Sequence, residues 1–235
     1  MTTSTARPLV DDDLDWVVAA LGRRRAALVP HAPVFWRPAP DAAARHREHL
    51  THLLGDGGAL GWRTDDAVLV AARLGDGWLV DDAAAPDDRW DDEGALLWEA
   101  FSGECRGSSV RFVCPTYETG RAAFARGVGL AVSESWWLRE LDGPGGGGPG
   151  VRVALPGAAA RTVAAPPVYA PPGPVLFLPG PVGDGRAVSA ALGEAPGLGC
   201  SAVVVNQPAG GPGLLDVLRR AGFRRHCDYL TGTVA

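Results

Sequence analysis

Four side chains in this sequence could accept or donate a proton in a reaction. Glu134 lies in VSESWW, which we expect to be a strand near the centre of a sheet, and its carboxylate is a candidate general base. Tyr117 follows the expected strand VRFVCP and could act as an acid. Asp81 and Asp82 end the expected strand GWLVDD, where neighbouring side chains face opposite sides of a sheet. The alternatives are a solvent-facing carboxylate and a tyrosine packed on the surface.

A glycine-rich turn, GPVGDGR, could bind an anion. Gly180, Gly183 and Gly185 give flexible backbone between an expected strand and an expected helix, and Arg186 adds a positive charge. Successive backbone N–H groups and a helix N-terminus both attract phosphate groups. The alternative is a plain turn, because glycine is abundant throughout this chain.

The histidines and cysteines do not form a metal or nucleophile pattern. His46, His49 and His52 follow one another at steps of three, so they drift around a helix and are expected to be solvated. His226 and its neighbours Cys227 and Asp228 share a strand and should point apart. We therefore expect no metal.

Composition narrows the class of protein. The 235 residues are 46% hydrophobic, enough for one large core or two small ones. The net charge of −5 argues against nucleic-acid binding. No apolar run approaches the length of a membrane span, and four cysteines without a disulfide-like spacing suit a reducing compartment. We expect a cytoplasmic protein with neither nucleic-acid nor membrane partners.

The expected elements alternate between helices and strands. The segments that must position the candidate residues are helices at 12–29, 41–54, 94–103, 118–127, 185–195 and 213–222, and strands within 58–85 and at 110–115, 132–141, 175–178, 201–207 and 224–232. The segment DGPGGGGPG, residues 142–150, should be a linker or an exposed loop.

The second half of the chain repeats part of the first at an offset of 93 residues. VRFVCP matches VVVNQP, Pro115 falls opposite Pro208, and Gly129 falls opposite Gly222. Strand–helix–strand units can look alike by chance, but an ungapped phase over some 45 residues favours duplication of a β-α-β-α-β unit.

The segment VVVNQPAGGPGLLDVLRRAGFRRHCDYL resembles the GCN5-related N-acetyltransferases (GNATs), with their strand, Asn, helix, Gly-Phe and final strand. The resemblance implies an α/β fold with a mixed sheet flanked by helices. It also implies a full GNAT-like domain at 1–141, a linker region at 142–169 and a half copy at 170–235, which would pack on the first domain or form a homodimer.

The resemblance also implies a site for acetyl-CoA where two parallel strands separate. The pyrophosphate would lie on the turn RWDDEG, with Arg89, Gly94 and Ala95 as contacts. Asp92 replaces the middle glycine of the family pattern, and the charges of this turn oppose a diphosphate, although they also suit the first turn of a helix.

The same resemblance assigns roles in acyl transfer. Backbone N–H groups near Ala84 or Ala85 would stabilise the oxyanion, Glu134 or Asp82 would be the base, and Tyr117 or water the acid. The family's usual acidic tyrosine is replaced by Ala125 and Leu218 in the two copies. We expect an acyl-CoA-dependent N-acyltransferase acting on a small amine. The alternative is a catalytically degenerate member that binds a ligand or a partner.

Overall fold

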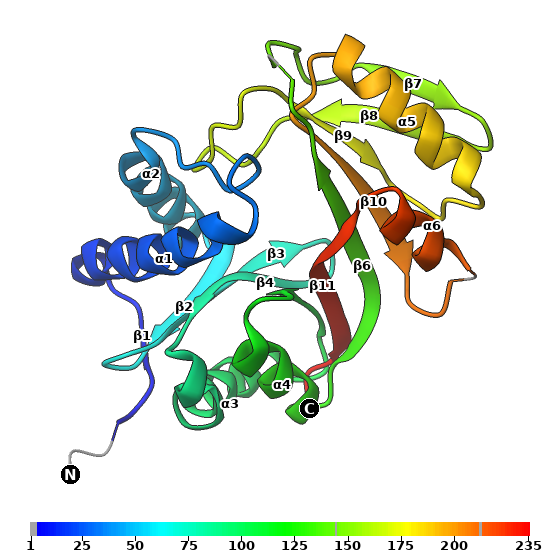
Figure 1. Cartoon of the computed structure of the whole chain (residues 1–235). Coiled ribbons are helices and arrows are strands. Elements are labelled where there is room, and N and C mark those ends of the chain that lie inside the picture. The colour runs from blue at the N-terminus through cyan, green and yellow to red at the C-terminus, as the bar shows by residue number, and fades with distance from the viewer. Residues whose placement is uncertain (1–3, 144, 212) are drawn as a thin grey trace. The chain divides into compact units, whose positions relative to one another are not determined.

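A computed structural model describes residues 4–143, 145–211 and 213–235 (Figure 1). The chain forms two compact units. The first unit contains residues up to 27, residues 43–132 and residues 229–235. The second unit contains residues 28–42 and 133–228. Both units are of the expected α/β class.

The first unit is built from a sheet and four helices. Its elements are β1 (Arg7–Pro8), α1 (Leu14–Leu28), α2 (Ala42–Gly55), β2 (Ala59–Arg63), β3 (Val68–Leu74), β4 (Gly77–Ala84), α3 (Ala95–Cys105), β5 (Ser109–Pro115) and α4 (Thr119–Gly127). The strands follow the order β1-β2-β3-β4-β5. They are antiparallel up to β4, and β4 and β5 are parallel, because α3 carries the chain back across the sheet.

Side chains alternate between the two faces of the strands in the first unit, and both faces are buried. Val68 and Val70 of β3 pack in a cluster with Leu21 of α1 and Leu50 of α2. Leu69 and Ala71, the neighbours of these valines, pack instead in a cluster that includes side chains of α3 and α4. The helical pairs α1/α2 and α3/α4 therefore cover opposite faces.

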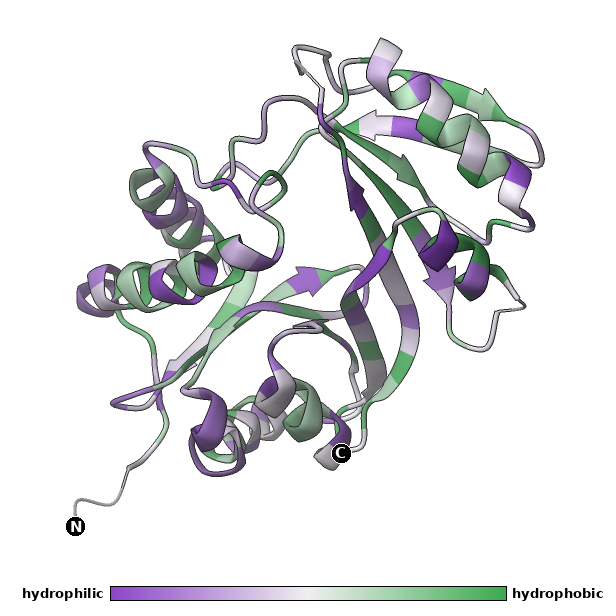
Figure 2. Ribbon diagram, viewed as in Figure 1, coloured by the Kyte–Doolittle hydropathy of each residue, from purple (hydrophilic) through white to green (hydrophobic). Residues whose placement is uncertain are grey.

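The second unit has four strands of its own and two α-helices. Its elements are β7 (Arg152–Leu155), β8 (Ala158–Val163), β9 (Val175–Leu178), α5 (Gly185–Gly197), β10 (Ala202–Pro208) and α6 (Leu214–Arg220). The strands run in the order β7-β8-β9-β10, and only β9 and β10 are parallel. Figure 2 shows β10 hydrophobic until its carboxyl end, where the polar Asn206 and Gln207 lie.

Two long strands have residues in both units: β6 (Ala131–Glu140) and β11 (Arg224–Thr233). Residues 134–140 of β6 pair with β10 of the second unit. The last residues of the chain belong to the first unit, where Val234 exchanges backbone hydrogen bonds of 2.8 and 2.9 Å with Gly107 and Ser108. The first unit therefore includes a segment from the carboxyl end of the chain, after the residues of the second unit.

The structure differs from the expected domain plan in residues 142–169. This stretch contains the hairpin β7–β8, whose strands are joined at Pro156 and Gly157. Gly157 has a φ of +70°, a backbone conformation that glycine adopts without strain. The Pro-Gly pair between VRVAL and AAARTV is a turn signal that the high glycine and proline content of the region obscured.

Candidate functional site

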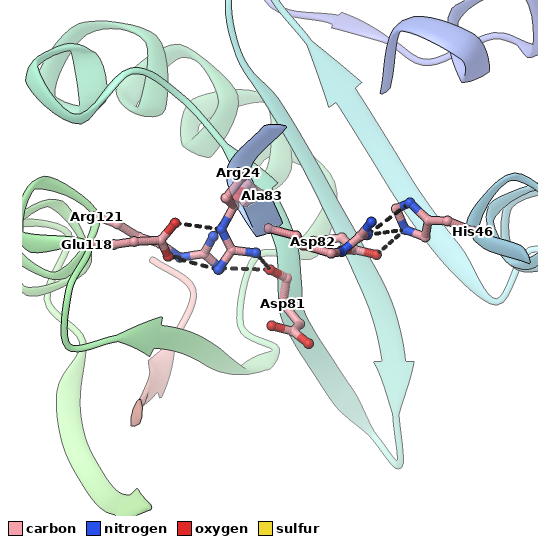
Figure 3. Close-up of polar contacts among 8 residues, drawn as sticks. Arg24, His46, Asp81, Asp82, Ala83, Glu118 and Arg121 are labelled. Atoms are coloured by element: carbon pink, nitrogen blue, oxygen red, sulfur yellow. Dashed lines mark hydrogen bonds and ion pairs between the residues drawn. The ribbon is translucent and has the colours of Figure 1, made fainter. Parts of the chain in front are cut away.

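Asp82, a predicted base, lies in an ion-pair cluster at the end of β4 (Figure 3). His46 Nε2 lies 2.9 Å from one carboxylate oxygen and Arg25 Nη2 lies 3.3 Å from the other. Burial would raise the pKa of Asp82, but the hydrogen bond from His46 and the charges of His46 and Arg25 hold it well below its usual value. The cluster joins β4 to α1 and α2. His46 is thus buried and paired, contrary to the expected solvated histidine.

Asp81 faces away from this cluster, as strand alternation predicts. Asp81 is an exposed residue, and among the described residues its carboxylate has no hydrogen-bond or ion-pair partner (Figure 3). Desolvation by surrounding protein atoms and the charge of Asp82 raise the pKa of Asp81. Asp81, rather than Asp82, is therefore the available carboxylate at the end of β4.

The parallel strands β4 and β5 separate after the pair Val80 and Phe112. The guanidinium of Arg121, a fully buried residue of α4, lies against the separated part of β4. It donates hydrogen bonds to the carbonyl oxygens of Ala83 and Asp81, the latter at 2.9 Å. Arg121 therefore already occupies the carbonyl oxygens of Asp81 and Ala83 at this edge of β4.

The expected turn RWDDEG is helical in the structure: a 3-10 helix at Asp87–Arg89 is followed by a π-helix at Trp90–Gly94, which leads into α3. Its charged side chains pair with one another. Glu93 is only 2% exposed; it accepts a 2.7 Å hydrogen bond from Arg89 and a 3.2 Å hydrogen bond from Ser4. A Cβ on Gly94 would lie 2.8 Å from the ring of Trp90, so packing accounts for this glycine. The predicted contact Arg89 is therefore already paired with a buried carboxylate.

The remaining predicted residues of the first unit lie at the end of β4, at the start of α3 and after β5. Ala84 ends β4, Ala85 follows it, and Ala95 begins α3. Tyr117 lies in the turn between β5 and α4. Glu118, its neighbour, forms a 2.6 Å ion pair with Arg24 (Figure 3). The pairing of Arg24 with Glu118 joins residues 94 positions apart, and no local pattern in the sequence indicates it.

Glu134 lies in the second unit, on β6 opposite Pro208 at the carboxyl end of β10. Asn206 Nδ2 donates a 2.6 Å hydrogen bond to its carboxylate. Because the amide nitrogen faces Glu134, Oδ1 of Asn206 points elsewhere; it is buried and has no hydrogen-bond partner among the residues described. This pairing fixes the predicted base at the ends of the parallel strands.

The glycine-rich turn before α5 leads from the end of β9, beside Asn206. A Cβ on Gly180 would lie 2.3 Å from the carbonyl oxygen of Asn206, whereas Gly183 has open space around it. Asp184 caps α5 by accepting from the N–H groups of Arg186 at 2.9 Å and Ala187 at 3.4 Å. The side chain of Arg186 pairs with Asp184 at 2.9 Å and is 83% exposed.

Three solved structures are similar to nearly the whole chain. A candidate acetyltransferase from Thermoplasma acidophilum matches with a TM-score of 0.61 and 9% identity, over 97% of this chain and 99% of that one. A GCN5-related N-acetyltransferase from Sphaerobacter thermophilus matches with a TM-score of 0.54 and 14% identity, over 100% and 96%. A candidate acetyltransferase from Pyrococcus horikoshii matches with a TM-score of 0.52 and 12% identity, over 100% and 91%. No protein-family model and no curated protein matches the sequence.

The chain has the GNAT fold. At these identities the likeness extends to the fold alone, so the site must be judged from its own residues. No helix in the described part of the chain has the length and apolarity needed to cross a membrane. The same residues contain no group of three or more side chains suited to a metal.

The two units differ in how well they would fit the diphosphate of an acyl-CoA. In the first unit of this GNAT fold, the segment DDRWDDE puts five carboxylates beside one guanidinium, which Glu93 already binds. Arg121 also occupies the edge of β4. This unit fits a diphosphate poorly, because its carboxylates repel the phosphates and the side chains of Arg89 and Arg121 are already paired within the chain.

The second unit fits better. Gly183 leaves backbone exposed, Arg186 is at the surface, and α5 presents its N-terminus. Asp184 competes for the same N–H groups, but its ion pair with Arg186 is exposed and such pairs are weak. An incoming phosphate could therefore replace the Asp184 carboxylate on the helix.

Proposed function

We propose that this protein is an acyl-CoA-dependent N-acyltransferase for a small amine, and that its second unit carries the reaction. The pair Glu134–Asn206 is the observation that supports the proposal most directly. It lies at the carboxyl ends of β9 and β10, the edge at which open α/β sheets bind ligands. The GNAT fold of the chain agrees with acyl transfer.

Glu134 is the proposed general base. A primary amine must lose a proton as its nitrogen attacks an acyl group, and a carboxylate within hydrogen-bonding reach can accept that proton. Asn206 positions the carboxylate through the 2.6 Å hydrogen bond from its amide nitrogen. Asp81 is the corresponding candidate in the first unit, where the donor turn is acidic.

The turn before α5 is the proposed site for the phosphates. Gly183 and the first N–H groups of α5 would hold them, and Arg186 would add its charge. A bound thioester would supply the acyl group: the amine nitrogen would form the amide bond as the C–S bond breaks, Glu134 would take the proton of the amine, and the leaving thiolate would take a proton from water. The predicted contacts Arg89, Gly94 and Ala95 then belong to a first unit whose anion site is closed, and Ala84, Ala85, Tyr117 and Asp82 remain predictions for that unit.

A catalytically degenerate binding protein is the second candidate. The filled strand edge and acidic turn of the first unit favour it, because both would exclude an acyl-CoA there. The two candidates differ in a simple titration. The enzyme binds acetyl-CoA in calorimetry, whereas the degenerate protein gives no heat and no thermal shift at millimolar acetyl-CoA.

Replacing Glu134 tests the catalytic proposal. With acetyl-CoA and a panel of small amines, mass spectrometry should detect N-acetylated product. Glu134→Gln should lower kcat by about 10²–10⁴-fold, the usual contribution of a general base, with little change in acetyl-CoA affinity. Glu194→Gln on exposed α5 removes the same charge and serves as the control. A wild-type rate for Glu134→Gln would exclude Glu134 as the base.

Two arginine variants, one in each unit, test which unit binds the phosphates of the acyl donor acetyl-CoA. Arg186→Gln should weaken acetyl-CoA binding about fivefold or more, since a charged contact to phosphate is lost. Arg89→Gln should leave the affinity unchanged, because Glu93 already holds Arg89. Calorimetry measures both, and the reverse pattern would move the donor site to the first unit.

A further inference from the structure

One face of the second sheet carries a group of half-buried aromatic side chains. Along β6, β9 and β10, alternate residues such as Trp137, Leu176 and Val203 pack in a cluster with α5 and α6. The intervening residues face the other side, around buried Leu138 and Val204. The aromatic residues there, called the aromatic face below, are Phe35, Trp36, Trp136, Tyr169 and Phe177.

The arm at residues 28–42 adds Phe35 and Trp36 to this face. Glu140 of β6 accepts hydrogen bonds of 2.8 Å from the backbone N–H groups of Val34 and Phe35. Pro38 forms a β-bridge with Tyr169, and the rings of Trp36 and Tyr169 lie 5.0 Å apart. The two aromatic residues of the arm are therefore fixed in place on the sheet.

The polar groups of the face are suited to a positively charged ligand. Glu134 and Trp136 are two positions apart on β6, so both side chains lie on this face. Oδ1 of Asn206 is a buried hydrogen-bond acceptor without a partner among the described residues. An ammonium group brings N–H donors for the carboxylate of Glu134 and for Oδ1 of Asn206, and its positive charge complements that carboxylate.

The histidine in this cluster does not add a positive charge. The ring of His226 lies 4.9 Å from that of Phe35 and 5.1 Å from that of Trp36. Burial lowers the pKa of His226 to about 3, with smaller effects from Arg224 and His31, so the ring is neutral at pH 7. The electron-rich faces of aromatic rings attract cations, and no charged imidazole opposes them here.

We propose that the aromatic face binds the amine substrate as an aryl-alkyl ammonium, with its ring among the aromatic side chains and its ammonium at Glu134 and Asn206. The inference rests on the proposed acyltransferase function and names the acceptor class. The ammonium group is placed where Glu134 can take its proton.

The test compares two ligands of like shape and opposite charge, without any acyl donor. Phenethylamine and 3-phenylpropionate are titrated into the full chain at pH 7 by calorimetry, with tryptophan fluorescence as a second readout. Phenethylamine should bind at least tenfold more tightly. Glu134→Gln should weaken phenethylamine binding at least tenfold and leave 3-phenylpropionate unchanged.

Further variants separate the face from general effects. Trp136→Leu should weaken phenethylamine binding at least fivefold, whereas Glu194→Gln, which removes a surface charge from α5, should have no effect. Circular dichroism confirms that each variant is folded. If Trp136→Leu does not fold, the phenethylamine affinity of the isosteric variant Glu134→Gln decides the test.

Equal affinity for the two ligands, or affinity that neither Glu134→Gln nor Trp136→Leu changes, would overturn the inference. The proposed function fails separately. If phenethylamine binds but no amine is N-acetylated, the proposed acyltransferase function is rejected and the proposed ammonium site is retained. If aliphatic amines are acetylated as readily as phenethylamine, the proposed acyltransferase function is retained and the proposed aryl-alkyl ammonium site is rejected.

Discussion

Asp13 is a buried carboxylate that ties three segments of the first unit together. Its oxygens accept two hydrogen bonds from Arg7 at 2.6 and 2.7 Å and one from Arg63 at 3.2 Å. The backbone N–H of Val10 donates a fourth, at 3.0 Å. The hydrogen bonds from Arg7 are the largest influence, and the pKa of Asp13 falls to about 2.

Asp13→Asn should therefore lower the free energy of unfolding by about 2 kcal/mol at pH 7. A depressed carboxylate pKa stabilises the fold above the unfolded value near 4, and this contribution is lost as the pH falls from about 4 to about 2. Urea unfolding of wild type and variant should show a gap that narrows below pH 4. A gap that is constant with pH would show that the charge is not its cause.

At the scale of single residues, the sequence identified carboxylates better than their partners. Glu134 and the acidic turn before α3 were visible because a charge in an expected strand or helix start is a local feature. The partners were not, since Asn206 lies 72 positions from Glu134, and Arg121 lies 38 and 40 positions from the carbonyl groups that it binds. Only the folded chain brings these groups together.

The elements repeat in phase, which supports the proposal that the chain contains a duplicated unit. β5 and β10 have equal lengths at an offset of 93 residues, as do β6 and β11. Gly129 and Gly222, again 93 apart, both have positive φ, +89° and +79°. The N–H of each donates to the carbonyl three residues earlier, at 3.0 Å in both turns.

Because the turns at Gly129 and Gly222 have the same backbone geometry, substitution of either glycine should lower the free energy of unfolding by a similar amount. Gly129→Ala and Gly222→Ala should each destabilise the protein by about 1–2 kcal/mol, because a Cβ strains the left-handed backbone although both sites have room for it. Gly127→Ala, at an open position that ends α4, should be neutral or slightly stabilising. Thermal unfolding measures all three, and unequal costs at the two turns would weaken the proposed equivalence.

Helices and central strands were predictable because their apolar periodicity is strong. The expected helices 12–29 and 41–54 correspond to α1 and α2, and the strand ends of β5 and β10 fall where Pro115 and Pro208 stand. The pairing of β6 with β10 was not predictable, because a strand's pattern reports which face is buried but not which neighbour it has.

For the molecule as a whole, the two units share their strands rather than dividing at the glycine-rich segment. β6 begins in the first unit and pairs with β10 of the second, and residues 229–235 belong to the first unit again. A protease cut within the exposed segment 148–150 should therefore leave the two fragments associated in gel filtration without denaturant. Separate, independently folded fragments would contradict this exchange.

The hydrogen bonds of Val234 with Gly107 and Ser108 also constrain the order of folding. They join residues that are far apart in the sequence, and contacts of this kind form slowly because a long loop must close first. The backbone pairing of the first unit therefore cannot be completed by residues 4–132 alone.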